Sequence, residues 1–234
     1  FVRGVPNVKK AFAKVWGTND LLTSFDGVSL WRPWNIDPSW KTQSGQAWFH
    51  IDQHPISKPG KQCIQGLINL LPTSKEIGGN VVIPKSHNFF KDLPEEYKER
   101  VERLPLDIDH FRFPHDDPKL SSEPAVMAHM EPGDMLLWDS RTIHCSSSGS
   151  SLPDGTNDLI RAASLICMMP KKLSSKEILD KRIHAAENLV STTNWTNDFR
   201  NADEFPIILE AENRDQYKWP KKPNLSDYQK ELIA

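Results

Sequence analysis

Short apolar runs separated by glycine, proline and polar clusters dominate the first 170 residues of the chain. Runs in which apolar side chains alternate with polar ones, or form brief blocks, predict strands over 23–34, 47–52, 64–71, 80–84, 125–130, 135–140 and 159–169. Many short strands with such turns are typical of a sandwich or barrel of the jelly-roll kind, and they do not fit alternating βαβ units. We therefore expect a mainly β fold with flanking helices.

Three segments have the spacing of amphipathic helices. Residues 6–16 begin with a proline, which suits a first helical turn, and residues 94–104 carry a short apolar face. Residues 174–190 open with Ser174 and Glu177 at the spacing of a capping box. These helices are predicted to flank the strands.

The segments without a period are predicted to be loops. Residues 107–124 are interpreted as an irregular surface loop, and residues 145–158 as a long flexible one. We expect a single domain over 1–234, with a jelly-roll core at about 20–172 and a C-terminal helical and irregular wrap at about 173–234.

Composition narrows the classes of partner. Lys and Arg total 29 and Asp and Glu total 31, a formal charge of −2 that gives no basic stripe for nucleic acid. No apolar run approaches the roughly 18 residues that a membrane span needs. Three cysteines without a CxxC pair favour a reducing compartment. We expect a small-molecule substrate and a cytoplasmic location, while the oligomeric state, and any targeting segment before Phe1, stay open.

The stretch WFHIDQHP concentrates polar donors in a chain that is otherwise poor in histidine. Because side chains at i and i+2 share one face of a strand, His50 and Asp52 point the same way, with Trp48 and Gln46 before them. Phe49 and Ile51, which alternate with these residues along the strand, are apolar and face the opposite layer. One imidazole and one carboxylate are therefore expected side by side over an apolar backing.

A third ligand is expected from His144, where an apolar strand runs into a polar loop. Two histidines and one carboxylate on one face of an octahedron, with the other positions open, form the centre of non-haem Fe(II) oxygenases. A helical zinc pair of His50 and His54 is disfavoured, because Pro55 pushes His54 out of the α region. Taken alone, however, the HxD triplet fits a solvated turn or a hydrogen-bonded core pair equally well.

The order of several motifs resembles the phytanoyl-CoA dioxygenase family of Fe(II)/2-oxoglutarate oxygenases. These motifs are HID at 50–52, GGNVVIPKSH at 78–87, PGDMLLWDSRTIHCS at 132–146 and IRAASL at 160–165. The resemblance covers roughly residues 20–170. It implies a double-stranded β-helix of the cupin-like, jelly-roll type that uses Fe(II), 2-oxoglutarate and O2.

Carried over residue by residue, the resemblance implies that the iron ligands are His50, Asp52 and His144. It also implies that the 2-oxoglutarate carboxylate is bound by Arg161, supported by Ser146, with further donors on the strand after the HxD pair, Gln65 and Asn69. Arg suits that role because its planar fork binds a carboxylate through two parallel hydrogen bonds. Trp31, Gln46, Trp48 and Arg141 are candidates for lining the substrate space.

Two features depart from the family pattern. Lys85 stands where the family usually has glycine, and the loop between His144 and Arg161 is long, which leaves Arg141 as a rival anchor. Arg161 is favoured, because strict alternation turns Arg141 to the other face.

The resemblance implies hydroxylation of an unactivated C–H bond, with 2-oxoglutarate converted to succinate and CO2. Asp52 occupies the position where related halogenases carry a small residue, so halogenation is disfavoured. Two alternatives stay open at this point. One is a non-catalytic jelly-roll protein that binds a metal or ligand, and the other is a cupin-type metalloenzyme that does not use 2-oxoglutarate.

Overall fold

The computed structural model describes residues 1–41, 48–198 and 222–234. Its contacts divide the chain into two compact units, one formed by Phe1–Gly27 with Leu165–Ala234 and the other by Val28–Ser164. The single domain expected from the sequence stays a prediction.

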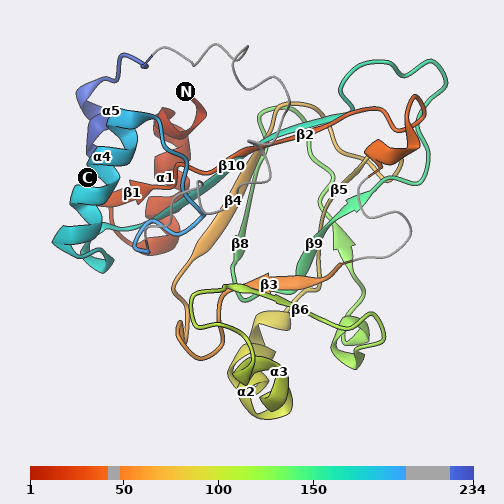
Figure 1. Ribbon diagram of the computed structural model, residues 1–234. Coiled ribbons are helices and arrows are strands. Elements are labelled where there is room, and N and C mark those ends of the chain that lie inside the picture. The colour runs from red at the N-terminus through yellow and green to blue at the C-terminus, as the bar shows by residue number, and fades with distance from the viewer. Residues whose placement is uncertain (42–47, 199–221) are drawn as a thin grey trace, which may run out of the picture. The chain divides into compact units, whose positions relative to one another are not determined.

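The unit Val28–Ser164 contains a five-stranded antiparallel sheet. Its strands, in spatial order, are β6 (His110–Arg112), β3 (His50–Asp52), β9 (His144–Ser148), β5 (Gly78–Val82) and β7 (Val126–Met127). Strand β3 therefore lies between β6 and β9, although these three strands are far apart in the sequence (Figure 1).

Further antiparallel pairs in this unit belong to a second sheet. Strand β4 (Ile64–Asn69) pairs with β8 (Met135–Asp139), and β2 (Val28–Trp31) pairs with the first four residues of β10 (Arg161–Pro170). The backbone N–H of Leu70 donates to the carbonyl of Ala162, which ties the end of β4 to β10. The predicted fold class, mainly β with jelly-roll sheets and helices, is confirmed.

The apolar face of the five-stranded sheet is covered by short helices. Phe49 and Ile51, which alternate with the polar residues of β3, belong to a buried cluster with Ile83, Leu93 and Val101. The last two come from α2 (Leu93–Glu96) and α3 (Lys98–Glu102), which lie below β3 and β6 in Figure 1. This packing fixes which face of β3 is apolar, and so leaves the opposite face to its polar side chains.

The unit Phe1–Gly27 with Leu165–Ala234 is mostly helical. Its helices are α1 (Pro6–Trp16), α4 (Lys176–Asn188) and α5 (Asp227–Glu231), and its strand β1 (Leu21–Thr23) pairs with Met168–Pro170 of β10. Short 3₁₀ helices complete the two units: η1 (Val2–Gly4), η2 (Pro38–Trp40), η3 (Ser86–Asp92), η4 (Pro118–Ser121) and η5 (Lys171–Leu173).

Several predicted boundaries were wrong, for identifiable reasons. The strand expected over 23–34 is split, because the Asp26 side chain accepts from the N–H of Gly27 and turns the chain between β1 and β2. The helix expected over 94–104 is two helices separated at Tyr97, whose ψ of 34° departs from helical values. The third helix is capped by Ser175 rather than Ser174, since the Ser175 hydroxyl accepts from Ile178 N–H.

Both predicted loops contain strands. Residues 107–124 include β6, and residues 145–158 begin inside β9, which starts at His144. Conversely, the strand expected over 125–130 shrinks to Val126–Met127. Pairing with distant strands supplies backbone partners to segments whose own sequence period is weak, which is why the local pattern missed them.

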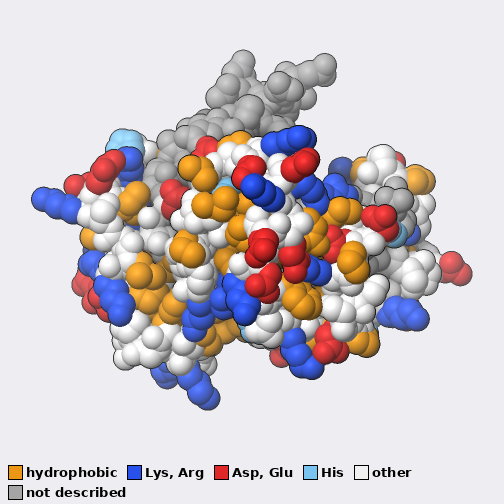
Figure 2. All heavy atoms as spheres, turned by 90° about the horizontal axis from the view of Figure 1, so that it is seen from below, with side chains coloured by type: hydrophobic (Ala, Val, Ile, Leu, Met, Phe, Trp, Pro, Cys, Tyr) orange, Lys and Arg blue, Asp and Glu red, His pale blue; other side chains and the backbone are white. Residues whose placement is uncertain are grey.

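The face of the molecule drawn in Figure 2 carries charges of both signs. Figure 2 shows Lys and Arg side chains interspersed with Asp and Glu side chains across the face that it displays. Of the helices in the described ranges, none combines the length and the apolar character needed to cross a bilayer.

Candidate metal centre

Two neighbouring strands bring His50, Asp52 and His144 onto one face of the five-stranded sheet. His50 and Asp52 are two residues apart on β3, so both side chains leave the same side. His50 lies directly opposite His144 of β9 in the antiparallel register, and opposed residues also share a face. Both imidazoles are buried, and Asp52 is partly buried.

The three side chains converge within a few ångströms. Asp52 Oδ1 lies 3.5 Å from His50 Nε2, and Asp52 Oδ2 lies 3.3 Å from His144 Nε2. The Nδ1 atoms of His50 and His144 face the carbonyls of Trp48 and Thr142, at 3.0 and 2.8 Å. A carbonyl can only accept, so each Nδ1 carries a proton in these bonds and each Nε2 is left to face Asp52 with either a proton or a metal ion.

Two imidazole Nε2 atoms and a carboxylate therefore point at one another, an arrangement that requires a proton or a cation between them. Burial alone would raise the pKa of Asp52, but hydrogen bonds from His110, His144 and His50 outweigh it and hold that pKa well below its usual range. The carboxylate is thus ionised at neutral pH. The donor set of two imidazoles and one carboxylate fits a divalent transition metal.

A third imidazole, which sequence reasoning did not assign to this site, lies against the same carboxylate. His110 on β6 is directly opposite Asp52, and its Nδ1 lies 3.4 Å from Asp52 Oδ1. The donor atoms of His50, Asp52 and His110 all lie within 4.8 Å of one another. The alternation His110-Phe111-Arg112-Phe113 was the signal that could have identified β6 as a strand with His110 on its polar face.

Gln65 supports the carboxylate from the second sheet. Its Nε2 donates to Asp52 Oδ2 at 2.9 Å, while its Oε1 is buried with no hydrogen-bond partner in the described structure. The structure thus places Gln65 beside the candidate metal ligands. Its expected contact with 2-oxoglutarate stays a prediction.

Two tryptophans enclose the histidines. Trp48 stacks on His50 with ring centroids 4.5 Å apart, and its Nε1 donates to the carbonyl of Ser146. Trp138 of β8 lies 5.4 Å from the ring of His144. These rings shield the imidazoles from water on their flanks.

Arg161 is buried beside this cluster, and none of the described residues provides a counterion for it. The residue is 1% exposed and its guanidinium stacks over Trp31 at 4.6 Å, and among the described residues its one polar contact is from Nη1 to Ser146 Oγ at 3.4 Å. Ser146 is two residues beyond His144 on β9, so it faces the same side. Burial lowers the pKa of Arg161 to about 10, and within the described ranges no carboxylate pairs with it.

A second buried arginine, in contrast, has its guanidinium hydrogen-bonded to several backbone carbonyls. Arg182 of α4 is equally buried, but it donates to the carbonyls of Ile233, Thr23 and Leu232 at 2.7, 2.6 and 3.2 Å. Arg161 has no such set of acceptors, and its Nε is without a partner. A buried cation left in this state is expected to receive an anionic ligand.

Buried amide oxygens add to the unsatisfied polar groups near Arg161. Asn80 of β5 is directly opposite Ser146, and its Oδ1 has no hydrogen-bond partner among the described residues. The Oδ1 of Asn69, at the end of β4, likewise has no hydrogen-bond partner among the described residues. Asn80 was not singled out from the sequence, because its register with β9 is a long-range property.

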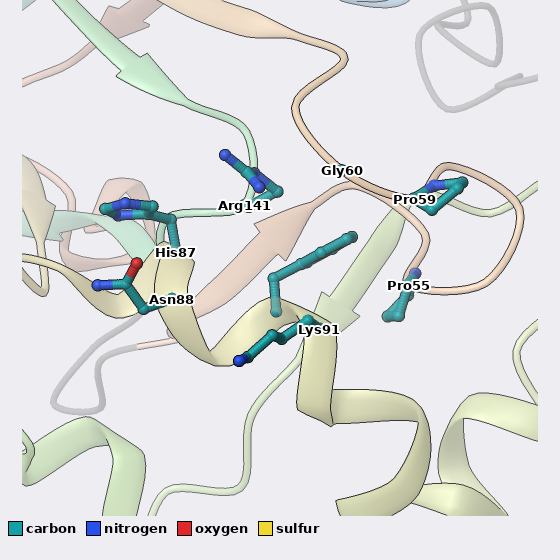
Figure 3. A pocket seen from close by; sticks show the side chains of 8 residues that line it. Pro55, Pro59, Gly60, His87, Asn88, Lys91 and Arg141 are labelled. Atoms are coloured by element: carbon teal, nitrogen blue, oxygen red, sulfur yellow. The ribbon is translucent and has the colours of Figure 1, made fainter.

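Two other candidates lie apart from the cluster or outside the described residues. Arg141 forms a two-point ion pair with Asp139, at 2.9 and 2.7 Å. It lines a cavity of about 730 Å³ with His87, Lys91 and other residues (Figure 3), none of which belongs to the cluster. The assignment of Gln46 lies outside the described residues.

His54 is buried, and its side chain hydrogen-bonds to the backbone of the turn in which it lies. Its Nδ1 accepts from the backbone N–H groups of Ile56 and Ser57, both at 3.0 Å. Its ring is therefore engaged in holding the chain after β3, in keeping with its separation from the HxD pair.

Comparisons with known proteins give one strong family match. The family model described as phytanoyl-CoA dioxygenase (PhyH) matches residues 15–152. Ava biosynthesis cluster protein O of Aspergillus versicolor is 33% identical over 199 residues, covering 82% of this chain and 60% of that protein. The putative phytanoyl-CoA dioxygenase of Dictyostelium discoideum is 22% identical over 225 residues, with 83% and 60% covered.

The chain thus spans 60% of the length of these two curated relatives. Among solved structures, the epimerase SnoN in complex with Fe³⁺, alpha ketoglutarate and nogalamycin RO is similar, with a TM-score of 0.44 and 16% identity. That match covers 72% of this chain and 57% of SnoN. Since the family model extends over more than half of the sequence, including the whole of β3 and β9, the chain belongs to the phytanoyl-CoA dioxygenase (PhyH) family.

Proposed function

We propose that this chain is an Fe(II)/2-oxoglutarate-dependent oxygenase that hydroxylates an unactivated C–H bond of a small organic substrate. In the balanced reaction, the substrate, O2 and 2-oxoglutarate give the hydroxylated product, succinate and CO2. Membership of the PhyH family supports the general class, and the side chains of the candidate centre support the cofactor and the co-substrate.

The observation that carries the proposal is the buried Arg161, which has no carboxylate partner in the part of the chain that the structure describes and lies on the side of the sheet to which the His–Asp cluster points. A guanidinium there matches a dicarboxylic co-substrate, because one carboxylate can pair with arginine while the keto-acid end reaches the metal. An arginine whose N–H groups already donate to backbone carbonyls, as those of Arg182 do, would not favour an anionic ligand in this way.

His50, Asp52 and His144 are the side chains proposed to hold the ion. When bound, Fe(II) and 2-oxoglutarate supply the oxidising chemistry, and the protein contributes binding, orientation and exclusion of water. Gln65 holds the carboxylate of Asp52 in place by its N–H···O bond, and outer hydrogen bonds of this kind orient a ligand and tune its basicity.

The co-substrate space is proposed to lie between Arg161 and the cluster. Ser146 connects the two, because its hydroxyl touches Arg161 while its strand carries His144. The unpaired oxygens of Asn80 and Asn69 and the ring of Trp31 are the further groups available there. Their unmet hydrogen bonds are expected to be used by the ligand or by water that it displaces.

The test is succinate release from 2-oxoglutarate in the presence of Fe(II) and a panel of small molecules. The wild-type chain should release succinate, whereas Asp52→Ala and Arg161→Gln should not. Arg103→Gln is a matched control, because Arg103 is exposed on α3's C-terminal side and pairs only with Glu99 there. Equal activity in the wild type, Arg161→Gln and Arg103→Gln would rule the proposal out.

The third imidazole favours a second candidate, a cupin-type metalloenzyme that does not use 2-oxoglutarate. His110 would give such a centre a richer nitrogen ligand set. The two candidates differ at Arg161, whose replacement should leave a reaction without 2-oxoglutarate intact and abolish one that needs it.

A further inference from the structure

His110 has no role assigned by the motifs or by family membership, yet it shares an oxygen with a proposed metal ligand. Its Nδ1 lies 3.4 Å from Asp52 Oδ1, and His50 Nε2 lies 3.5 Å from the same oxygen. The two rings face each other with centroids 4.4 Å apart. Two imidazoles therefore converge on Oδ1, while His144 and Gln65 converge on Oδ2.

These separations fit donors that share one ion. Two donors that each lie about 2.1 Å from a metal are about 3.0 Å apart at a right angle and about 3.4 Å apart at a tetrahedral angle. A charge-assisted N–H···O bond is shorter, at about 2.7–2.9 Å. The observed 3.4 Å between His110 and Asp52 is longer than such a bond and lies at the upper end of the range for two donors of one ion.

The fold directs His110 to this position. β6 pairs with β3 through three residues, with Asp52 opposite His110 and His50 opposite Arg112. Phe111 and Phe113 anchor the other face of β6 in the buried cluster beneath the sheet. A slip of one residue would expose those two rings, so the register that presents His110 to Asp52 is fixed by the core.

We propose that His110 is a fourth, dissociable metal ligand, so that the resting centre has three imidazoles and one carboxylate. The inference rests on the proposed function, because it places the ion on the same His50, Asp52 and His144. His110 differs from the other two histidines in accessibility: its side chain is 45% exposed, whereas theirs are 6% exposed.

That difference gives His110 a regulatory consequence. A six-coordinate ion held by four side chains would have two positions left, which a chelating co-substrate would fill. The exposed ring at the sheet edge is the protein ligand with room to leave, so His110 would be the side chain that keeps the centre closed until substrate takes its place.

The experiment follows the histidine ring nitrogens of the ¹⁵N-labelled chain by two-bond ¹H–¹⁵N correlation spectra, before and after one equivalent of Zn²⁺. In the wild type, zinc should shift the ring-nitrogen signals of three histidines. One of these three sets of signals should be absent from the spectrum of His110→Gln. His110→Gln should also bind Zn²⁺ at least about tenfold more weakly by calorimetry. His115→Gln is the matched control, since His115 is an exposed histidine of the same unit, and it should bind zinc like the wild type.

A second readout separates a ligand from a merely structural residue. With Fe(II) and 2-oxoglutarate but no substrate, His110→Gln should release succinate faster than the wild type, because its centre lacks the closing ligand. If the His110 ring nitrogens do not shift and His110→Gln binds zinc as tightly as the wild type, the inference is overturned while the proposed function stands. Undiminished zinc binding in His50→Ala and Asp52→Ala would instead overturn the proposed function.

Discussion

Replacing Arg161 with methionine should make the ligand-free protein more stable while destroying its response to 2-oxoglutarate. The guanidinium is buried with a single weak hydrogen bond, and burial lowers its pKa from 12.5 to about 10. A lowered pKa in a base means that the charged form destabilises the fold at every pH below about 10, so the whole cost is present at neutral pH. A shift of this size corresponds to about 3 kcal/mol.

Some of that cost is offset by the stacking of Arg161 over Trp31, a cation–π contact that contributes about 1 kcal/mol. Methionine has a similar length and no charge, so the net gain should be about 2 kcal/mol in the free energy of unfolding. For a chain of this size the melting temperature should rise by about 4–8 °C.

The assay is thermal unfolding with and without 2-oxoglutarate, in the presence of Zn²⁺. At a ligand concentration of one hundred times Kd the wild type should gain about 2.7 kcal/mol, and Arg161→Met should gain nothing. Arg182→Met is the control, because it removes the donor to the carbonyls of Ile233, Thr23 and Leu232 and should lower the melting temperature. The reasoning is refuted if Arg161→Met is destabilised like Arg182→Met and is still stabilised by 2-oxoglutarate.

Three further substitutions test individual contacts. Gln65→Leu removes the donor to Asp52 Oδ2 and should weaken Zn²⁺ binding about tenfold in calorimetry; an unchanged Kd would contradict the orienting role. Ser146→Ala removes the one hydrogen bond to Arg161 and should weaken 2-oxoglutarate binding about two- to tenfold, while zinc affinity stays the same. Tyr97→Phe removes the 2.6 Å bond to Asp117 and should lower the free energy of unfolding in urea by about 1–2 kcal/mol. Burial and this bond raise the pKa of Tyr97, so the wild type, unlike Tyr97→Phe, should lose this contribution as pH rises above about 10.

The polar face of β3 was predictable because it depends on a local rule. Alternation along a strand places His50 and Asp52 together whatever the strand pairs with, and the apolar residues between them fix which face is buried. The same rule places His144 and Ser146 on one side of β9. The structure brings these residues together, and their roles as ligands stay predictions.

The contributions of His110 and Asn80 were not predictable from local rules. Each reaches the site through the register of a strand pair that joins distant segments, Asp52 with His110 and Ser146 with Asn80. Strand β6 is three residues long and sits in a segment rich in turn residues, so its period was hidden. The pairing with β3, stabilised by Phe111 in the core, overrides that local signal.

The choice between the two candidate arginines depended on parity alone in the sequence, and the structure adds a physical reason. Arg141 is neutralised by Asp139 two residues earlier, through a turn whose N–H also bonds that carboxylate. Arg161 is left without an acidic partner in the ranges that the structure describes. An arginine that is already paired with a carboxylate binds an anionic ligand less favourably than an arginine that is not.

The measurement that tests the central claim most directly is the visible absorption spectrum of the chain with Fe(II) under anaerobic conditions, titrated with 2-oxoglutarate. A keto acid that chelates protein-bound Fe(II) gives a charge-transfer band, and the account predicts a saturable band in the wild type that is absent in Asp52→Ala and much weaker in Arg161→Met. A wild-type spectrum that does not change, with no 2-oxoglutarate binding by calorimetry, would contradict it.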